Sequence, residues 1–161
     1  MNTAPNQGTS RIEARLSELG YTLPAVVPPV AAYVPAVISG NHVYTSGQLP
    51  MIDGKLTVTG KVGAGISAED AKSLAATSAI NAIAALKSVL GDLDRVTRIV
   101  KVVGFVASDP SFTGQPGVIN GASELLGEVF GEAGVHARSA VGVSVLPLDS
   151  PVEVELIAEF Q

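Results

Sequence analysis

Residues 67–91, SAEDAKSLAATSAINAIAALKSVLG, carry the strongest helical pattern in the chain. Ser67 occupies the N-cap position, and Asp70 stands three residues later, where a capping box places its acidic residue. Gly91 ends the pattern, as glycine commonly does at a helix C-terminus. Apolar or small side chains recur every three or four residues, which predicts a helix with one face on a core. These side chains are Leu74, Ala75, Ala79, Ala82, Ile83, Leu86, Val89 and Leu90.

A shorter helix is expected nearer the N-terminus. Residues 10–19 have apolar or small side chains at helical spacing, and Ser10 can cap the start of the helix. Residues 21–32 contain three prolines, which predicts an extended connector rather than a regular element. We expect residues 1–9 to be a disordered lead-in and residues 10–161 to form a single domain.

Three short strands are expected between the two helices, over residues 33–38, 42–46 and 55–58. A Gly-Asn pair precedes the second strand and an Asp-Gly pair precedes the third, and both pairs are typical of tight hairpin turns.

Beyond the long helix, the pattern predicts one strand, one helix and then two strands. Their ranges are 95–107, 115–131, 137–146 and 152–159. We expect the last two strands to pair as an antiparallel hairpin around the LPLDSP loop. The order of elements favours an α+β fold, with a single sheet and two main helices packed on one face. The chain has few elements left to cover the other face, which favours association with further copies.

The composition narrows the class of protein. The chain has 161 residues, 47% hydrophobic and 16% charged, with a formal net charge of -5. Because the ten basic residues are scattered, we expect no nucleic-acid partner. No uninterrupted apolar run has the length of a membrane span, and the polar N-terminal residues do not resemble a signal peptide, so a cytoplasmic location is expected. Cysteine is absent, which excludes disulfides and thiolate metal sites.

Several motifs are present only in part. The glycines of GKVGAG, residues 60–65, lack the Lys-Ser/Thr pair of a phosphate-binding loop. His42 and His136, the only two histidines, lie far apart and have no metal-ligand spacing. Asp92 and Asp94 are interpreted as solvated turn residues. The sequence therefore predicts neither a metal site nor a cofactor.

A set of short motifs recurs in one order along residues 31–160. The motifs are Tyr33, Ser46-Gly47-Gln48-Leu49-Pro50, Asn120, Ala137-Arg138-Ser139, Leu146-Pro147 and Val152-Glu153-Val154-Glu155. In that order the chain resembles the RidA family, the reactive intermediate deaminases, which are also labelled L-PSP endoribonuclease-like proteins. The resemblance covers roughly four fifths of the chain.

The resemblance implies a chorismate-mutase-like fold and a homotrimer with ligand clefts between subunits. It also implies hydrolysis of reactive 2-imino or enamine acids, such as 2-aminoacrylate, to a 2-keto acid and ammonia, without metal or organic cofactor. Arg138 and Glu153 would be the catalytic residues. Substrate-binding positions would be Tyr33, Ser46, Gly47, Asn120 and the main-chain carbonyl of Ala140.

The residue types suit this chemistry. A guanidinium such as that of Arg138 binds a carboxylate through two parallel hydrogen bonds, and a glutamate can position or deprotonate water. Glu155 faces the same side of its strand as Glu153, so either glutamate could act. In the expected hairpin, Glu153 would oppose Ser144, roughly 20 Å from Arg138 at about 3.3 Å per residue. We therefore expect the two catalytic residues to come from different copies.

Two departures leave an alternative function open. Gly142 stands where typical deaminating members of the family carry a glutamate, and the first sixteen to thirty residues form an extension relative to compact members. The alternative is a non-catalytic trimer that binds keto acids or similar metabolites. A ribonuclease activity is disfavoured, because two isolated histidines and a negative net charge suit neither acid–base cleavage nor phosphate binding.

Overall fold

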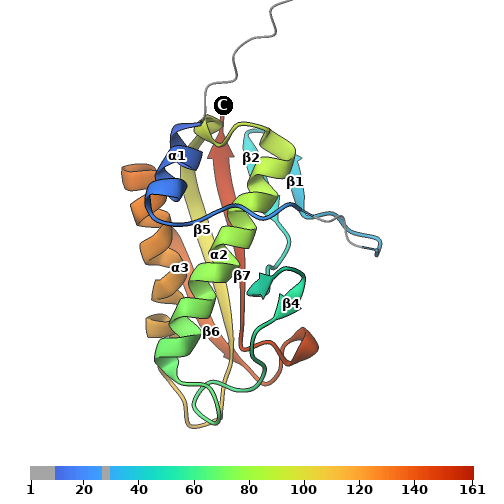
Figure 1. Cartoon of the computed structure of the whole chain (residues 1–161), viewed down its shortest axis with the longest axis vertical. Helices are drawn as coiled ribbons and strands as arrows, with labels where there is room; N and C mark the ends of the chain where they lie inside the picture. Colours follow the sequence, from blue (N-terminus) through green and yellow to red (C-terminus); the bar gives the residue numbers. More distant parts are fainter. Residues whose placement is uncertain (1–9, 27–29) are drawn as a thin grey trace, which may run out of the picture.

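The computed structural model describes residues 10–26 and 30–161, so the expected lead-in over residues 1–9 lies outside the described residues. The described chain forms a five-stranded sheet with helices on one face and a separate two-stranded hairpin (Figure 1). In chain order the elements are α1 (Arg11–Glu18), β1 (Ala36–Ser39), β2 (His42–Thr45), β3 (Met51–Ile52), β4 (Lys55–Leu56), α2 (Ala68–Leu90), β5 (Val96–Ala107), α3 (Gln115–Phe130), β6 (Ala137–Val143) and β7 (Val152–Phe160). The expected α+β class, with one main sheet, is confirmed.

The two helical termini expected from capping residues are confirmed. Ser67 accepts a hydrogen bond from the Asp70 backbone N–H at 3.0 Å at the start of α2. Ser10 accepts one from the Glu13 N–H at 3.3 Å at the start of α1. Asp94 does not behave as a solvated turn residue, because its carboxylate accepts hydrogen bonds from Ser10 and from the first backbone N–H groups of α1. These hydrogen bonds join the N-terminal helix α1 to the turn that precedes β5.

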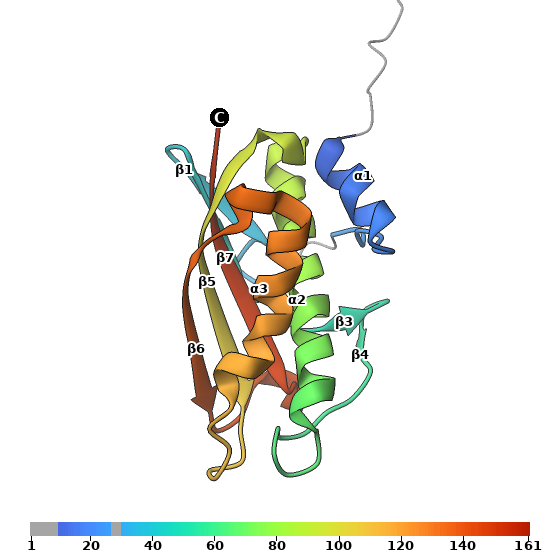
Figure 2. The same cartoon turned by 90° about the vertical axis from the view of Figure 1, so that its left-hand side faces the viewer.

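Helices α2 and α3 lie side by side on one face of the sheet, and α1 packs outside them (Figure 2). The buried side chains of α2 are mostly small, which lets α3 approach closely. Gly121 of α3 lies directly over the backbone of α2, where a Cβ atom would overlap the Lys72 carbonyl oxygen. By length and composition α2 could cross a membrane, but most of its apolar stretch is buried in this core.

The strand order is β1-β2-β7-β5-β6, which corrects the expected hairpin. The last two strands, β6 and β7, do not pair, because β5 lies between them, parallel to β6 and antiparallel to β7. The physical reason is the α3 crossover, which returns the chain to the same sheet as a parallel strand. A short 3₁₀ turn at Pro147–Asp149 then leads the chain to the other side of β5.

The two faces of the sheet differ in their covering. Strand β7 alternates buried Val152, Val154, Leu156 and Ala158, which face the helices, with partly exposed residues that face away. The helices lie on one side only, and no other part of the described chain covers the second side (Figure 2). Val37, Tyr44 and Val141 remain exposed on this uncovered face.

Candidate functional site

The strand register places Arg138 and Glu153 on opposite faces of the sheet. Arg138 pairs with buried Val102 of β5, and Glu153 pairs with Phe105. Directly paired residues share a face, so Arg138 faces α3 and Glu153 faces away from the helices. The two residues are offset by two strands and three positions, so their Cα atoms are roughly 14 Å apart. This geometry replaces the expected one, in which Glu153 opposed Ser144, yet it also separates the two residues within one chain.

Glu153 belongs to a first group of site residues, together with Gly47, Ser46 and Tyr33. Gly47 follows β2, and the carboxylate of Glu153 occupies the place that a side chain at Gly47 would fill. The pairing changes here, since Tyr44 pairs with Ile157 whereas Gln48 bridges Val154. One extra residue is thus inserted, as at a β-bulge, and bulges commonly redirect a side chain or backbone group.

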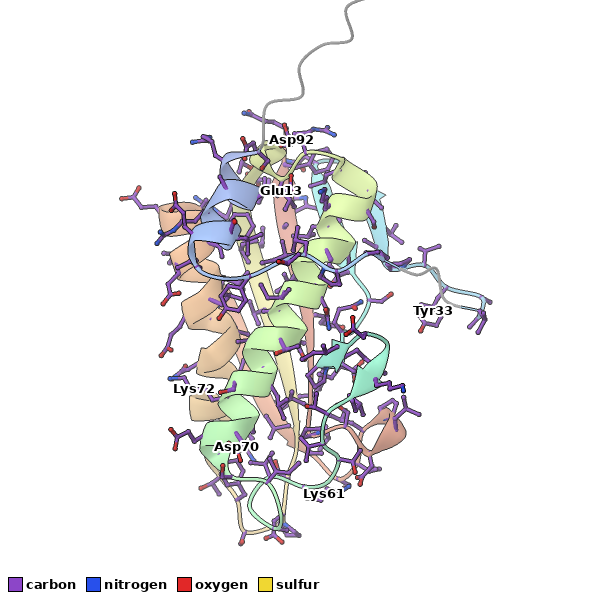
Figure 3. All side chains as sticks on the ribbon, viewed as in Figure 1. Glu13, Tyr33, Lys61, Asp70, Lys72 and Asp92 are labelled. Atoms are coloured by element: carbon purple, nitrogen blue, oxygen red, sulfur yellow. The ribbon has the colours of Figure 1, made fainter. Side chains whose placement is uncertain are left out.

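The connector that carries Tyr33 is attached to the same place. The Ser46 hydroxyl donates to the Val34 carbonyl at 2.6 Å, and the Ser46 backbone N–H donates to the Pro35 carbonyl at 2.8 Å. Tyr33 itself is 59% exposed and projects away from the sheet (Figure 3). Ser46 therefore orders the connector within this chain, and its hydroxyl proton is engaged there.

The electrostatic environment of Glu153 suits proton transfer. Partial burial, followed by repulsion from the neighbouring carboxylate of Glu155, raises the pKa of Glu153 above its usual value. A carboxyl group with a raised pKa is a better general base and a better general acid near neutral pH than an ordinary one. Of the two candidate glutamates, Glu153 is the one that contacts Gly47.

Arg138 belongs to a second group, at the edge where β6 meets α3. Its Nη1 atom donates to Asn120 Oδ1 at 2.7 Å and to Ser123 Oγ at 3.2 Å. The backbone of Ala140 lies two residues further along β6 on the same face, paired with Gly104. Among the described residues, no carboxylate lies within ion-pair distance of Arg138. Its positive charge is held by neutral groups and is available to an anion.

The side chain of Gln115, on α3, fills the space that a side chain at Gly142 would enter. A Cβ atom at Gly142 would lie 2.8 Å from Gln115 Nε2 and 3.2 Å from Ser108 Oγ. Gln115 is held there, because Nε2 donates to the Phe112 carbonyl at 2.8 Å and to Ser108 Oγ at 3.2 Å. A neutral amide therefore stands where the family resemblance expects a carboxylate.

Two residues of the second group were not predicted, namely Ser123 and His136. His136 Nε2 lies 2.8 Å from Ser123 Oγ, which in turn accepts from Arg138. Their spacing offered a signal: His136 lies just before β6, two residues before Arg138, and Ser123 is three residues after Asn120, on the same face of a helix. Metal-ligand and catalytic-triad motifs have other spacings, so they do not reveal this pair of residues.

The hollows in the described chain lie away from the predicted site residues. Hollows of about 260 and 520 Å³ lie among α1, α2 and α3, and none of the predicted site residues lines them. Within residues 10–26 and 30–161, no three His, Asp or Glu side chains are grouped as metal ligands. The groups around Glu153 and Arg138 are therefore the candidate site.

Known proteins share this fold and much of this sequence. Residues 13–160 match the family described as "YjgF/chorismate mutase-like, putative endoribonuclease". Protein TCP17 of Trypanosoma cruzi is 45% identical over 152 residues, covering 94% of this chain and 95% of that protein. The crystal structure of protein Atu1372 of Agrobacterium tumefaciens, whose function is described as unknown, superposes with a TM-score of 0.88 at 50% identity, covering 94% of this chain and 93% of that one.

A relative with a named activity is more distant. The 2-iminobutanoate/2-iminopropanoate deaminase of Escherichia coli strain K12 is 36% identical over 137 residues, which cover 84% of this chain and 90% of that enzyme. Together with the match over residues 13–160, this similarity covers the sheet, both long helices and both groups of site residues. The chain therefore belongs to the RidA family, within the YjgF/chorismate mutase-like fold.

Proposed function

We propose that this protein is a hydrolytic deaminase of small reactive 2-imino or enamine acids, such as 2-aminoacrylate, and that it uses no metal. The observation that carries the proposal is the uncompensated charge of Arg138, held in place by Asn120 and Ser123. A half-buried guanidinium without a carboxylate partner favours an anionic ligand, and the substrate's own carboxylate supplies one. The named activity of the relative from Escherichia coli supports the same class of reaction.

The reaction requires only a few protein groups, provided that they hold the substrate and the water in the correct positions. Arg138 binds the carboxylate, and water attacks the carbon of the C=N bond to form a carbinolamine. Glu153 accepts a proton from that water and passes it to the imine nitrogen, which completes the carbinolamine. Glu153 then takes the proton of the carbinolamine hydroxyl and passes it to the amino nitrogen, so that the C=O bond forms, the C–N bond breaks and ammonia leaves the 2-keto acid. The raised pKa of Glu153, caused by burial and by Glu155, suits both proton transfers.

The homotrimer and the cytoplasmic location remain part of this proposal. Because Arg138 and Glu153 face opposite sides of one sheet, we propose that each complete site combines Arg138 of one copy with Glu153 of another. Tyr33, Ser46 and Gly47 would accompany Glu153, while Asn120 and Ala140 would accompany Arg138. The exposed apolar residues Val37, Tyr44 and Val141 support burial of the uncovered face between copies.

A second candidate function is non-catalytic binding of keto acids. The observation in its favour is the Gln115 amide above Gly142, which puts a neutral group where the typical deaminating relatives are expected to carry a carboxylate. Both functions require Arg138, and only the first requires turnover.

The deciding experiment measures binding and turnover together. Calorimetry with 2-ketobutyrate reports the carboxylate site, and ammonia release from enzymatically generated 2-aminoacrylate reports catalysis. Arg138→Ala removes two charge-assisted hydrogen bonds, each worth about 1.5–3 kcal/mol, so we expect binding to weaken by about 100-fold or more. Arg138→Lys should fail largely as well, because an ammonium is a point charge and cannot make the paired hydrogen bonds.

The control is Arg11→Ala, which removes a highly exposed arginine whose ion pair with Asp94 lies at the surface. It should bind 2-ketobutyrate like the parent protein. If the Arg138→Ala protein binds the keto acid as tightly as the parent, the assignment of the site is wrong. If the parent binds but releases no ammonia, the non-catalytic function is the correct one.

A further inference from the structure

A chain of hydrogen bonds extends from Arg138 away from the proposed ligand position. Arg138 Nη1 donates to Ser123 Oγ at 3.2 Å, and Ser123 Oγ lies 2.8 Å from His136 Nε2. His136 Nδ1 in turn lies 2.6 Å from the Gly134 carbonyl oxygen. Helix α3, the start of β6 and the 3₁₀ turn at Gly131–Gly134 are thus joined at the guanidinium.

The direction of each hydrogen bond follows from the chemistry of its ends. A carbonyl oxygen only accepts, so His136 Nδ1 carries a proton and donates to Gly134. In the neutral ring Nε2 is then an acceptor, and the Ser123 hydroxyl donates to it. The proton of Ser123 therefore faces His136, which leaves the oxygen lone pairs for Arg138.

The chain determines which edge of the guanidinium is free. Arginine has five N–H donors, two of them on Nη1. One Nη1 donor meets Asn120 and the other meets Ser123. Across the described residues, Nε and Nη2 have no hydrogen-bond partner. These two atoms form the planar edge that presents parallel N–H groups to a carboxylate.

Building on the proposed function, we propose that Ser123 and His136 are positioning residues for the substrate carboxylate. They hold Nη1 of Arg138 and direct the Nε–Nη2 edge toward the two oxygens of a 2-keto or 2-imino acid. The ligand class is thus a small 2-keto or 2-imino monocarboxylate bound in bidentate fashion. Neither residue touches the reacting carbon in this arrangement.

The first test separates positioning from catalysis. We compare Ser123→Ala, Ser123→Thr and His136→Phe, with His42→Gln as the control at the other histidine. Ser123→Ala should weaken 2-ketobutyrate binding and raise KM by roughly tenfold, the effect of one hydrogen bond to a charged group, with kcat close to that of the parent. Ser123→Thr keeps the hydroxyl and should bind like the parent, whereas His136→Phe keeps the ring but loses the acceptor and should resemble Ser123→Ala.

A nucleophilic role for Ser123 would give the opposite pattern. A serine hydroxyl that donates to a histidine is also the arrangement of an activated nucleophile. In that case Ser123→Ala and Ser123→Thr would both lower kcat strongly and leave KM little changed. That result would overturn the positioning proposal, and so would parent-like binding by both Ser123→Ala and His136→Phe.

The second test needs no variant of the site. Nitrogen-15 NMR of the imidazole rings distinguishes the two tautomers, and His42→Gln assigns the signals because the chain has only two histidines. We expect the neutral ring of His136 to carry its proton on Nδ1 and the Nε2 signal to shift in Ser123→Ala. A proton on Nε2 in the neutral ring would overturn the proposal.

The binding measurements distinguish a failure of the proposed function from a failure of the positioning role of Ser123 and His136 alone. If the parent binds no 2-ketobutyrate, the proposed function fails, and this inference fails with it. If the parent binds and Arg138→Ala does not, while the Ser123 and His136 variants bind normally, the proposed function stands and only the positioning role is wrong.

Discussion

At the scale of the single residue, Glu153 is placed where ionisation costs stability. Burial and the nearby Glu155 carboxylate raise the pKa of Glu153 above the usual 4.5. The folded chain therefore binds this proton more tightly than the unfolded chain. The stabilisation that comes from protonating Glu153 is fully present below about pH 4.5 and is lost as the pH rises through the folded-state pKa.

Glu153→Gln should therefore raise the free energy of unfolding at pH 7, because the amide stays neutral. The gain should disappear as the pH is lowered below 4.5. Urea unfolding at several pH values measures this difference. Glu132→Gln, at an exposed position, is the matched control and should change the free energy of unfolding by less than about 0.5 kcal/mol. A Gln variant less stable than the parent at pH 7 would mean that the Glu153 carboxylate has a favourable ionic contact.

The same residue links stability to function. The Glu153 carboxylate lies against Gly47 and is partly buried. Its ionisation lowers the stability of the fold, but its raised pKa suits proton transfer. Gly47 has no side chain, and any Cβ at that position would displace the carboxylate. The glycine is thus required by the close approach of Glu153 rather than by a turn.

At the scale of the element, the contact between α2 and α3 depends on Gly121. A Cβ atom there would overlap the Lys72 carbonyl oxygen, and a backbone atom cannot move aside as a side chain can. Gly121→Ala should therefore push the two helices apart and destabilise the protein by about 1–3 kcal/mol, the usual cost of overpacking. Thermal or urea unfolding measures the loss.

Gly127→Ala, on the same helix, is the matched control. No atom lies within 4 Å of the position that its Cβ would take. Alanine favours the helix over glycine by about 0.5–1 kcal/mol, so this variant should be more stable than the parent. If both substitutions stabilise the protein, the close packing of α2 on α3 described above is wrong.

At the scale of the whole molecule, the sheet separates the two catalytic candidates. Arg138 faces α3 and Glu153 faces the uncovered side, which supports the proposal that a ligand contacting both lies between copies. The proposed homotrimer provides such a position, because the edge strand β6 of one copy can approach the uncovered face of its neighbour.

A mixed oligomer tests this arrangement. Arg138→Ala and Glu153→Ala chains should each lack deaminase activity alone. After unfolding and refolding together in equal amounts, about a quarter of the sites should combine an intact arginine with an intact glutamate, as random pairing of neighbours in a ring predicts. Ammonia release measures the recovery. Mixed oligomers verified by mass spectrometry that remain inactive would count against shared sites.

The local elements could be predicted from the residues alone. The helix over residues 67–91, the Ser10 cap and the turn before His42 depend on side chains within a few positions of one another, so periodicity and capping describe them. Arg138 and Glu153 could also be predicted as site residues from the sequence, through their place in an ordered set of family motifs, and their catalytic role stays a prediction.

Only the tertiary structure decided how these parts meet. Strands over residues 137–143 and 152–160 have patterns that suit a hairpin equally well, and nothing local reveals that β5 lies between them. The pairing of strands is settled by long-range burial, after α3 has covered the sheet and brought β6 back in parallel. The same long-range packing placed His136 and Ser123 behind Arg138 and left Glu153 on the face opposite to Arg138, because the pairing register decides which residues of neighbouring strands share a face.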